Sequence, residues 1–406
     1  MDIIFLGGVL PQTEREAVLL KSIGCFQAAA NVLQMGYING LSRNGLIGEV
    51  IVINLPFIGS YPRRYRDLFY RPLSACCLEG NIRYINVPFF NLSAVKLFHR
   101  TYLSSKMLFR LLSSARAAED YYVFCYSMHL PFLIACYLSK ILNKRGKFCV
   151  IVPDLPEYMA ARRGIGERIS RIVSKLSYYI VNQMDSVVVI TEQMASKFPM
   201  VANKIVIEGM SDNSNREPYS EGLAGSKRYF LYTGTLDRRY GIRNLVDSYI
   251  KSGVIDCDLI ICGDGDDREY VIKASRLNCR IHYLGQIDRE RVLDLQRDAL
   301  VLINPRDNDS EYTKYSFPSK VIEYMTSGVP VLMYRLDGIP DEYYKYCFSI
   351  EPDADGMARA MAEVSRLSWT SLRAKGSEAR DFILRFKTSE RQIEKLLNSI
   401  IGCDDV

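Results

Sequence analysis

The chain has 406 residues, of which 48% are hydrophobic and 24% are charged. This is the composition of an ordinary globular protein, which argues against a disordered chain. The length exceeds what one hydrophobic core usually serves, so we expect two domains. No run of about 18 apolar residues occurs, so no membrane-spanning helix is expected. Residues 1–8 lack the basic lead and cleavage site of a signal peptide.

The net charge of +6 is unevenly distributed along the chain. Residues 1–225 contain 25 Lys and Arg against 17 Asp and Glu, whereas residues 226–406 contain 27 against 29. The basic first half predicts an anionic partner for that half. The 11 cysteines show neither CxxC nor metal-ligand spacing. That pattern is typical of reduced, buried cysteines in the cytoplasm, and Cys76 and Cys77 are expected in a loop.

Apolar strand-like segments alternate with helix-like segments along the whole chain, which predicts parallel sheets covered by helices on both faces. The helical patterns include 28–41, 165–182, 242–251 and 289–297. The predicted strands are 3–6, 49–54, 82–87, 121–126, 148–152, 186–190, 228–233, 258–262, 281–284, 300–304 and 330–334.

These elements predict an α/β fold of two doubly wound, Rossmann-like domains that face a cleft. The expected boundaries are 1–212 for the N-terminal domain, 213–227 for a polar linker and 228–385 for the C-terminal domain. A final helix in 386–406 is expected to pack back on the N-terminal domain. In such sheets ligands bind beyond the carboxyl ends of the strands, so the loops that follow those ends are the candidate sites.

The most informative segment is 315–331, which reads YSFPSKVIEYMTSGVPV. Pro318 and Ser319 fit the start of a helix, where Ser can accept backbone N–H bonds. Free N–H groups at such a start suit a phosphate, and Lys320 adds a positive charge. Glu323, one turn later, can accept hydrogen bonds from sugar hydroxyls, and Gly328 ends the helix. Together they predict a sugar-nucleotide pocket.

Two further loops of the second half carry candidate donor-binding residues. Gly234 follows the strand 228–233 and permits close approach of a ligand, while Arg238 and Arg239 could reach a phosphate. Gly263 follows the strand 258–262 and suits a tight turn beside a nucleotide base.

In the first half, candidates follow three predicted strands. Gly7 and Gly8 permit close backbone approach to an anion. His129 follows the strand 121–126, and Asp154 and Glu157 follow 148–152, where either carboxylate could orient or deprotonate an acceptor hydroxyl. A structural histidine and a turn-forming Asp are the alternatives.

The predicted helix 165–182 is amphipathic and basic. Arg168, Arg171 and Lys175 alternate with apolar residues, and Arg162 and Arg163 precede them. Such a helix can lie on an anionic membrane surface, and the aromatic and basic run 61–71 adds to that prediction. The alternative is a core-packed helix with a solvated basic face. Nucleic acid is not expected, because no recognised binding module accompanies these charges.

Four strings, LYTGTLDRRYGIRNLVDSYI, LIICGDGDDREY, IHYLGQID and YSFPSKVIEYMTSGVPVL, occur in the order seen in GT-B fold, family-4 type glycosyltransferases (glycosyl transferases group 1). The chain resembles this family most over 228–340, and more weakly through FLGG, YSMH and VPDLPEYM in the first half. NPR followed by YSFPSK, EYM and LDGIPDEY is most similar to enzymes of bacterial capsule and exopolysaccharide assembly.

The resemblance implies that a nucleotide-diphosphate sugar binds the C-terminal domain and a saccharide or lipid-linked acceptor binds the N-terminal domain. It implies retaining transfer without a metal or other cofactor, in the cytoplasm or on the inner face of the membrane. Glu323 matches the second Glu of the family's Glu-x7-Glu motif, which binds the ribose. Ser319 and Lys320 match the helix start beside the diphosphate, and His129 matches a histidine that contacts the donor sugar.

The sequence departs from the family at the first motif Glu, where it has Tyr315, and Glu311 is a candidate replacement. Thr235 and Tyr240 stand where many members carry the phosphate-clamping Arg and Lys, and Arg238, Arg239 and Lys320 are expected to compensate. Two other functions therefore stay open. One is a nucleotide-sugar 2-epimerase on the same fold, and the other is a non-catalytic nucleotide-sugar-binding protein.

Overall fold

The computed structural model describes the chain except for residues 24–27, 115–120, 144–145, 160–164, 212–227 and 403–406. The chain forms two compact units, one of Met1–Met210 with Ser389–Val406 and one of Ser211–Thr388. The expected boundaries at 212 and 385 fall within three residues of these divisions. The predicted linker 213–227 lies outside the described residues, as do Arg162 and Arg163.

The N-terminal unit is built on an eight-stranded sheet in the order β10-β9-β8-β7-β1-β2-β5-β4. Each described pair is parallel except β4 with β5. A separate ribbon pairs β3 (Phe69–Tyr70) with β6 (Phe89–Phe90). The strands of the sheet are β1 (Ile3–Gly7), β2 (Val50–Asn54), β4 (Cys76–Glu79), β5 (Ile82–Asn86), β7 (Tyr121–Tyr126), β8 (Gly146–Val152), β9 (Ser186–Val189) and β10 (Asn203–Val206).

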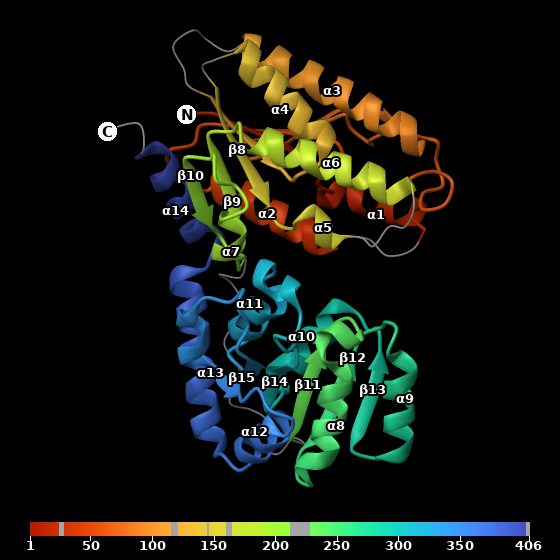
Figure 1. The fold of residues 1–406 in the computed structure, drawn as a ribbon, viewed down its shortest axis with the longest axis vertical. Coiled ribbons are helices and arrows are strands. Elements are labelled where there is room, and N and C mark those ends of the chain that lie inside the picture. Colours follow the sequence, from red (N-terminus) through yellow and green to blue (C-terminus); the bar gives the residue numbers. More distant parts are fainter. Residues whose placement is uncertain (24–27, 115–120, 144–145, 160–164, 212–227, 403–406) are drawn as a thin grey trace. The chain divides into compact units, whose positions relative to one another are not determined.

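Helices cover both faces of this sheet. The connections after β1 run toward β2, and those after β7 run toward β8, in opposite directions along the sheet. Because such crossovers are right-handed, the two sets of helices lie on opposite faces. One face carries α3 (Ser93–Ser114), α4 (Leu130–Leu142) and α6 (Ile165–Val181), which lie side by side (Figure 1). The other carries α2 (Ala28–Ser42) and the C-terminal helix α14 (Ser389–Ile401), which pack on each other. Shorter helices are α1 (Gln12–Lys21), α5 (Pro156–Met159) and α7 (Glu192–Ala195).

The C-terminal helix is part of the N-terminal unit's core. Ile393 and Leu396 of α14 are fully buried with β1 and β2 side chains such as Phe5 and Val52. A side chain at Gly40 of α2 would lie 2.6 Å from Ile393, so glycine permits the close packing of the two helices. Burying each such aliphatic side chain contributes roughly 1.5–3 kcal/mol. The chain therefore completes its first domain only with its last helix.

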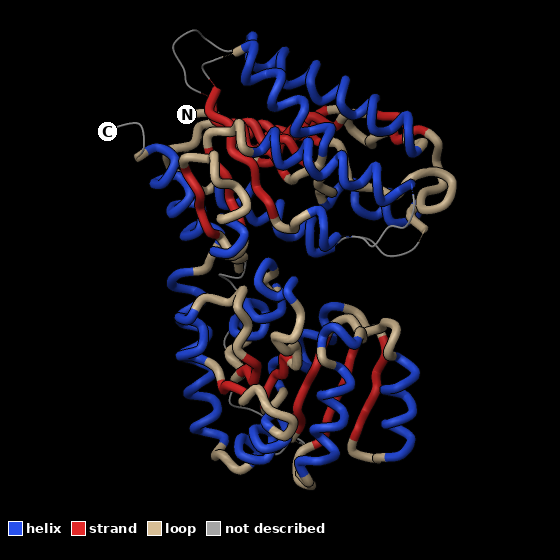
Figure 2. The backbone as a smooth tube through the Cα atoms, in the orientation of Figure 1, coloured by secondary structure: helices blue, strands red, loops and turns tan. Residues whose placement is uncertain are grey.

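The C-terminal unit is built on a six-stranded parallel sheet in the order β13-β12-β11-β14-β15-β16. Figure 2 shows strands of this sheet in red with helices around them in blue. Numbered within the unit, the strand order is the 3-2-1-4-5-6 order of dinucleotide-binding folds. The N-terminal unit repeats the same order through β5, β2, β1, β7, β8 and β9. The strands are β11 (Tyr229–Thr233), β12 (Asp258–Cys262), β13 (Ile281–Gly285), β14 (Val301–Asn304), β15 (Val331–Tyr334) and β16 (Phe348–Ile350).

Here too the helices cover both faces. On one face, α8 (Ile242–Ser252) packs against α9 (Arg268–Leu277) and α12 (Gly356–Ser365). The other has α10 (Arg289–Asp298) against β11, and α11 (Ser319–Thr326) against β14, β15 and α13 (Trp369–Phe386). Three 3-10 helices, η2 (Arg238–Tyr240), η3 (Glu311–Tyr315) and η4 (Asp341–Tyr346), lie in the connections.

One predicted loop is wrong. Cys76 and Cys77 begin the edge strand β4, which pairs antiparallel with β5. The segment is short, and its residues are exposed or half-buried, so it lacks the continuous apolar run by which the buried strands were recognised. Its backbone order comes from pairing with β5, which local composition does not reveal.

Candidate active site

In the C-terminal unit the chain leaves β11 and β14, which are neighbours, in opposite directions along the sheet. Ligands of such folds bind at this switch point, beyond the carboxyl ends of the two strands. The loop after β11 carries Gly234, Arg238 and Arg239, and the loop after β14 carries Pro305 and Arg306. The candidate donor residues therefore gather at the edge of the sheet where a nucleotide is expected.

Glycines let three of these loops cross in close contact. Gly234 N–H donates to Cys262 O at 3.0 Å, and a Cβ at Gly263, whose φ is +137°, would lie 1.8 Å from Gly234 O. A Cβ at Gly241, whose φ is +76°, would lie 2.0 Å from Pro305 O. Both positions need glycine for conformation and for space. Gly234 and Gly263 thus shape the loops after β11 and β12 together.

Helix α11 begins at Ser319, behind Pro318 as its N-cap residue, and no side chain caps it. The expectation that Ser319 would accept a capping hydrogen bond is therefore wrong. Ser319 is the first helical residue, one position too late for a cap, and it is exposed. The opening turn keeps N–H groups that no capping side chain satisfies, which suits an anionic ligand.

Glu323 occupies the next turn of α11 and is held from two sides. Its Oε1 accepts hydrogen bonds from Gln296 Nε2 of α10 at 2.7 Å and from Lys320 Nζ at 2.9 Å. Burial by itself raises the pKa of the Glu323 carboxyl, but the Lys320 charge and these hydrogen bonds outweigh it and hold the pKa below its usual range. The site therefore contains a fixed, ionised carboxylate.

The same network ties α11 to the end of β11. Tyr324 OH accepts from Thr233 N at 2.9 Å and donates to Thr233 O at 3.1 Å. Gln296 Nε2 also donates to Thr233 Oγ1 at 3.2 Å. Sequence reasoning missed Gln296, because α10 carries no motif and its buried amide is recognisable only from the packed structure.

Sequence reasoning also missed Arg306, which directly follows β14 and is only 4% exposed. Its guanidinium lies 4.4 Å from the Tyr312 ring centroid and 5.8 Å from that of Tyr240, and Nη1 donates to Ser316 Oγ at 3.3 Å. Nε and Nη2 are buried without a hydrogen-bond partner in the described part of the chain. Burial lowers the pKa of Arg306. Its place after a predicted strand, at Asn304-Pro305-Arg306, was the available signal.

The arginines predicted to clamp a phosphate lie in different environments. Arg239 is bound by Asp237, whose Oδ2 lies 2.6 Å from Arg239 Nη2, and these hydrogen bonds lower the pKa of the Asp237 carboxyl despite partial burial. Arg238 is exposed. Tyr312 OH donates to Arg239 O at 3.1 Å and so connects the loops after β11 and β14. Arg239 could bind a phosphate in place of the residues missing at Thr235 and Tyr240 only after its ion pair with Asp237 breaks.

Tyr315 and Glu311, the two candidates for the missing motif carboxylate, are the last and first residues of η3. Glu311 is exposed and Tyr315 is half-buried. The loop after β15 fixes this segment, since a Cβ at Gly338 would lie 2.5 Å from both Thr313 O and Ser316 O. The loop that contains Leu336-Asp337-Gly338 thus packs directly against the segment of Ser316, which accepts a hydrogen bond from Arg306.

In the N-terminal unit, His129 is the N-cap residue of α4, at the carboxyl edge of β7, and its side chain makes no capping hydrogen bond. Its ring stacks on Phe132 at 4.8 Å and on Phe57 at 5.4 Å between centroids. Burial, with the charges of Arg100 and Lys96, holds the pKa of His129 well below its usual range. The imidazole is therefore neutral at physiological pH.

The two carboxylates after β8 differ. Asp154 has a solvent-exposed surface, but many protein atoms surround its carboxyl and reduce its hydration. This partial desolvation raises the pKa of the Asp154 carboxyl. Glu157, in α5, accepts a hydrogen bond at 2.9 Å from Tyr178 OH of α6. Asp154 is the better placed of the two to accept a proton.

The loop after β1 is fixed by amide side chains. Gly8 N–H donates to Gln34 Oε1 at 2.9 Å and Val9 N–H donates to Asn54 Oδ1 at 2.9 Å. Gly7 and Gly8 are buried, and a Cβ on Gly7 would lie 2.7 Å from Gln34 Oε1. These N–H groups are occupied in this state, and the glycines serve close packing.

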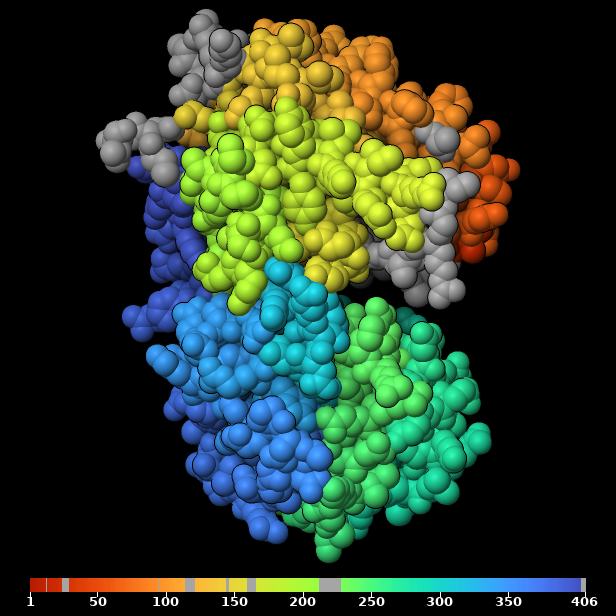
Figure 3. Space-filling model, viewed as in Figure 1, coloured from red at the N-terminus to blue at the C-terminus, as the bar shows by residue number. Residues whose placement is uncertain are grey.

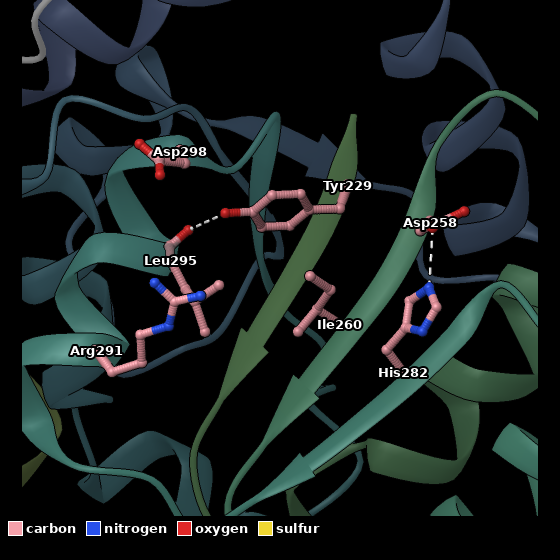
Figure 4. A pocket seen from close by; sticks show the side chains of 7 residues that line it. All are labelled: Tyr229, Asp258, Ile260, His282, Arg291, Leu295 and Asp298. Carbon is pink, nitrogen blue, oxygen red and sulfur yellow. Dashed lines mark hydrogen bonds and ion pairs between the residues drawn. The ribbon is translucent and has the colours of Figure 1, made fainter. Parts of the chain in front are cut away.

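A pocket of about 280 Å³ lies elsewhere in the C-terminal unit, mainly toward the amino ends of its strands (Figure 4). Tyr229 OH donates to Leu295 O at 2.8 Å, and His282 Nε2 lies 2.9 Å from Asp258 Oδ2. The pocket is away from the switch point. It lacks the helix start and the glycine loops that gather at the switch point, so it is not the candidate site.

Among the described residues no group of three or more His, Cys, Asp and Glu is arranged to hold a metal ion. None of the described helices is long and apolar enough to cross a membrane.

Residues 213–380 match the family of glycosyl transferases group 1. This match covers most of the C-terminal unit, the part of the chain in which the sequence motifs lie. A sequence relative, the N-acetyl-alpha-D-glucosaminyl L-malate synthase of Bacillus anthracis, is 20% identical over 226 residues. These residues are 52% of this chain and 56% of the relative, so the chain matches little more than half of that protein's length.

Solved structures resemble the whole chain. The lipopolysaccharide outer core galactosyltransferase WaaB in its apo form has a TM-score of 0.61 at 14% identity, over 99% of this chain and 100% of that one. An α,α-trehalose-phosphate synthase from Burkholderia xenovorans, in complex with glucose-6-phosphate, has a TM-score of 0.65 at 12% identity, over 99% and 100%. These similarities establish the predicted GT-B fold.

Proposed function

We propose that the protein is a glycosyltransferase that moves a sugar from a nucleotide diphosphate to a saccharide or lipid-linked acceptor. The observation that carries the proposal is the constellation at the switch point of the C-terminal unit. An uncapped helix start, the fixed Glu323 carboxylate and the partly unpartnered Arg306 guanidinium lie on loops and a helix at one edge of the sheet. The group 1 match over the same unit supports it.

Each group has a role that its chemistry suits. The ionised Glu323 accepts hydrogen bonds from the ribose hydroxyls of the donor nucleotide, at the positions that Gln296 and Lys320 leave open. The diphosphate lies at the start of α11, where the N–H groups of Ser319 and Lys320 and the helix dipole favour an anion. Tyr315 donates a hydrogen bond to the donor sugar.

The chemical step develops negative charge on the oxygen that leaves with the nucleoside diphosphate. The opening turn of α11, Lys320 and Arg306 stabilise that charge, so transfer proceeds without a metal ion. For Arg306 this requires Tyr312 or Tyr240 to move aside, because the guanidinium is covered in this state. The acceptor hydroxyl attacks from the face that the leaving group vacates, with retention of anomeric configuration.

The N-terminal unit supplies the acceptor side. The raised pKa of Asp154 suits a group that accepts the hydroxyl proton during attack. Neutral His129 can donate or accept a hydrogen bond to the transferred sugar. We assign the reaction to bacterial surface polysaccharide synthesis, such as capsule or exopolysaccharide, at the inner face of the membrane. The fold similarity to a lipopolysaccharide galactosyltransferase supports this assignment.

The first experiment is a thermal-shift screen of nucleotide sugars followed by incubation of the stabilising donor with and without saccharide and lipid-linked acceptors. We expect one donor to stabilise the protein and to lose its sugar to an acceptor. Conversion of the donor to its epimer without an acceptor would identify a 2-epimerase instead. Tight binding without turnover on any acceptor would identify a nucleotide-sugar-binding protein.

A further inference from the structure

Three neighbouring helices of the N-terminal unit present apolar side chains to solvent. On α3, Phe98, Tyr102 and Phe109 form one stripe at helical spacing, and Phe98 is 80% exposed. On α6 the stripe comprises Ile169, Ile172, Leu176 and Tyr179. Between them, α4 ends in the exposed residues Leu138, Ile141 and Leu142. Single exposed apolar residues are ordinary, but three aligned stripes on packed helices mark an interaction surface.

This surface is also strongly basic. Helices α3, α4 and α6 together contain eight Lys and Arg but one acidic residue, Glu167. Arg100 is buried, Lys96 is largely covered and Lys140 pairs with Asp185, so the positive charge of the surface comes mainly from the other five basic residues, which include the exposed Arg110. Lys106, Arg168, Arg171 and Lys175 are exposed beside the apolar stripes.

The three helices lie side by side over one face of the sheet, and their side chains form a continuous part of the molecular surface (Figure 1, Figure 3). We propose that this three-helix face, defined by the outward residues of α3, α4 and α6, docks on an anionic lipid bilayer. The apolar stripes enter the headgroup region while Lys and Arg contact lipid phosphates. A second copy fits less well, because two such faces would bring like charges together.

The position of the face relates it to the acceptor. Helix α4 begins at Leu130, after its N-cap residue His129 and beyond the carboxyl end of β7, and α3 begins after β5 at the same edge of the sheet. A bilayer on the three-helix face would therefore reach the edge where Asp154 lies. If the proposed transfer holds, the acceptor is a lipid-linked saccharide delivered from the membrane. The docking itself does not depend on transferase activity.

The test is co-sedimentation of the full chain with phosphatidylcholine vesicles, with and without about 30% phosphatidylglycerol, at low and high salt. We expect binding that requires the anionic lipid and weakens with salt. The combined variant Arg168→Glu, Arg171→Glu, Lys175→Glu should lower the partition coefficient by roughly tenfold or more. Phe98→Ser with Ile172→Ser should lower it by a similar factor, because these side chains would enter the bilayer.

Matched control variants are available on α9 of the other unit. Leu277→Ser removes a side chain that is 79% exposed, and Lys273→Glu with Arg276→Glu reverses two exposed charges. These controls should bind vesicles like the wild type. Circular dichroism and the thermal shift produced by the donor check that each variant is folded.

Three results would overturn the docking proposal. They are absence of binding to anionic vesicles, equal loss of binding in the α9 controls, and a wild-type dimer that Phe98→Ser dissociates. Donor binding in the same variants separates this proposal from the proposed function. Variants that no longer bind vesicles but keep the donor-induced thermal shift support the docking proposal. A wild-type protein that binds vesicles but no nucleotide sugar would contradict only the proposed transferase function.

Discussion

At the scale of single residues, Glu323 is the most constrained group of the candidate site. We predict that Glu323→Gln lowers affinity for the donor nucleotide by about tenfold to a hundredfold, because charged hydrogen bonds are each worth about 1.5–3 kcal/mol. Isothermal titration with the donor measures the loss. Glu269→Gln, an exposed residue in the first turn of α9, is the matched control. Equal affinities of wild type and Glu323→Gln would remove Glu323 from the site.

Arg306 is the second residue whose role can be measured. We predict that Arg306→Met weakens nucleoside diphosphate binding by roughly tenfold or more, and weakens nucleoside monophosphate binding less, because in the proposed complex the guanidinium contacts the terminal phosphate. Arg306→Lys should retain only part of the nucleoside diphosphate affinity, since an ammonium cannot donate the paired hydrogen bonds of a guanidinium. Arg276→Met on α9 controls for net charge. Equal losses for both nucleotides would indicate that Arg306 only supports the fold.

At the scale of elements, the crossing of the loops after β11 and β12 depends on Gly263. We predict that Gly263→Ala destabilises the C-terminal unit by about 2–4 kcal/mol, because the new methyl group would overlap Gly234 O in addition to the backbone cost. Gly253→Ala is the control, since Gly253 also has a positive φ, +67°, but its Cβ would meet open space. It should cost only about 1 kcal/mol. Urea denaturation of both variants measures the difference.

Helix α3 contains a lysine that makes stability depend on pH. Burial, with the nearby charge of Arg100, lowers the pKa of Lys96 to about 7, and its Nζ donates to Ile58 O at 2.5 Å. The unfolded chain, with a lysine pKa near 10.4, therefore binds more protons than the folded chain between pH 7 and that value. The free energy of unfolding must rise with pH across this window.

Lys96→Met isolates this effect. Relative to the variant, the wild type should become more stable from pH 7 to pH 9 and change little below pH 7. The Lys96 charge also lowers the pKa of His129, but burial is the larger cause, so His129 stays neutral above pH 7 in both proteins and the interval from pH 7 to pH 9 reports on Lys96. Denaturant midpoints at pH 6, 7, 8 and 9 provide the measurement. A difference that is constant over the whole range would contradict the lowered pKa.

The elements show what the sequence can predict. The strands 121–126 and 258–262 match β7 and β12 residue for residue, because continuous apolar runs bounded by polar residues are legible locally. Edge strand β4 was missed, since it is ordered by its neighbour. In the candidate site, the proximity of Glu323 and Lys320 was predictable because they lie one helical turn apart. Gln296 belongs to a different helix, and its position depends on how α10 packs.

At the scale of the whole molecule, the chain uses the same strand order twice and closes its first unit with its last helix. Each unit thus places its candidate residues at the carboxyl edge of a parallel sheet, where backbone N–H groups and loops meet a ligand. The strand order was predictable only as a class, because the right-handed crossover rule limits the topologies but does not select one.

Hydrogen exchange of the full chain, with and without saturating uridine, guanosine, adenosine or thymidine diphosphate in turn, tests most directly whether the switch point of the C-terminal unit binds the donor. We predict slower exchange in residues 233–241 and 304–323 with the diphosphate that binds. Saturating binding that leaves these segments unchanged, or that protects only segments of the N-terminal unit, would contradict the account.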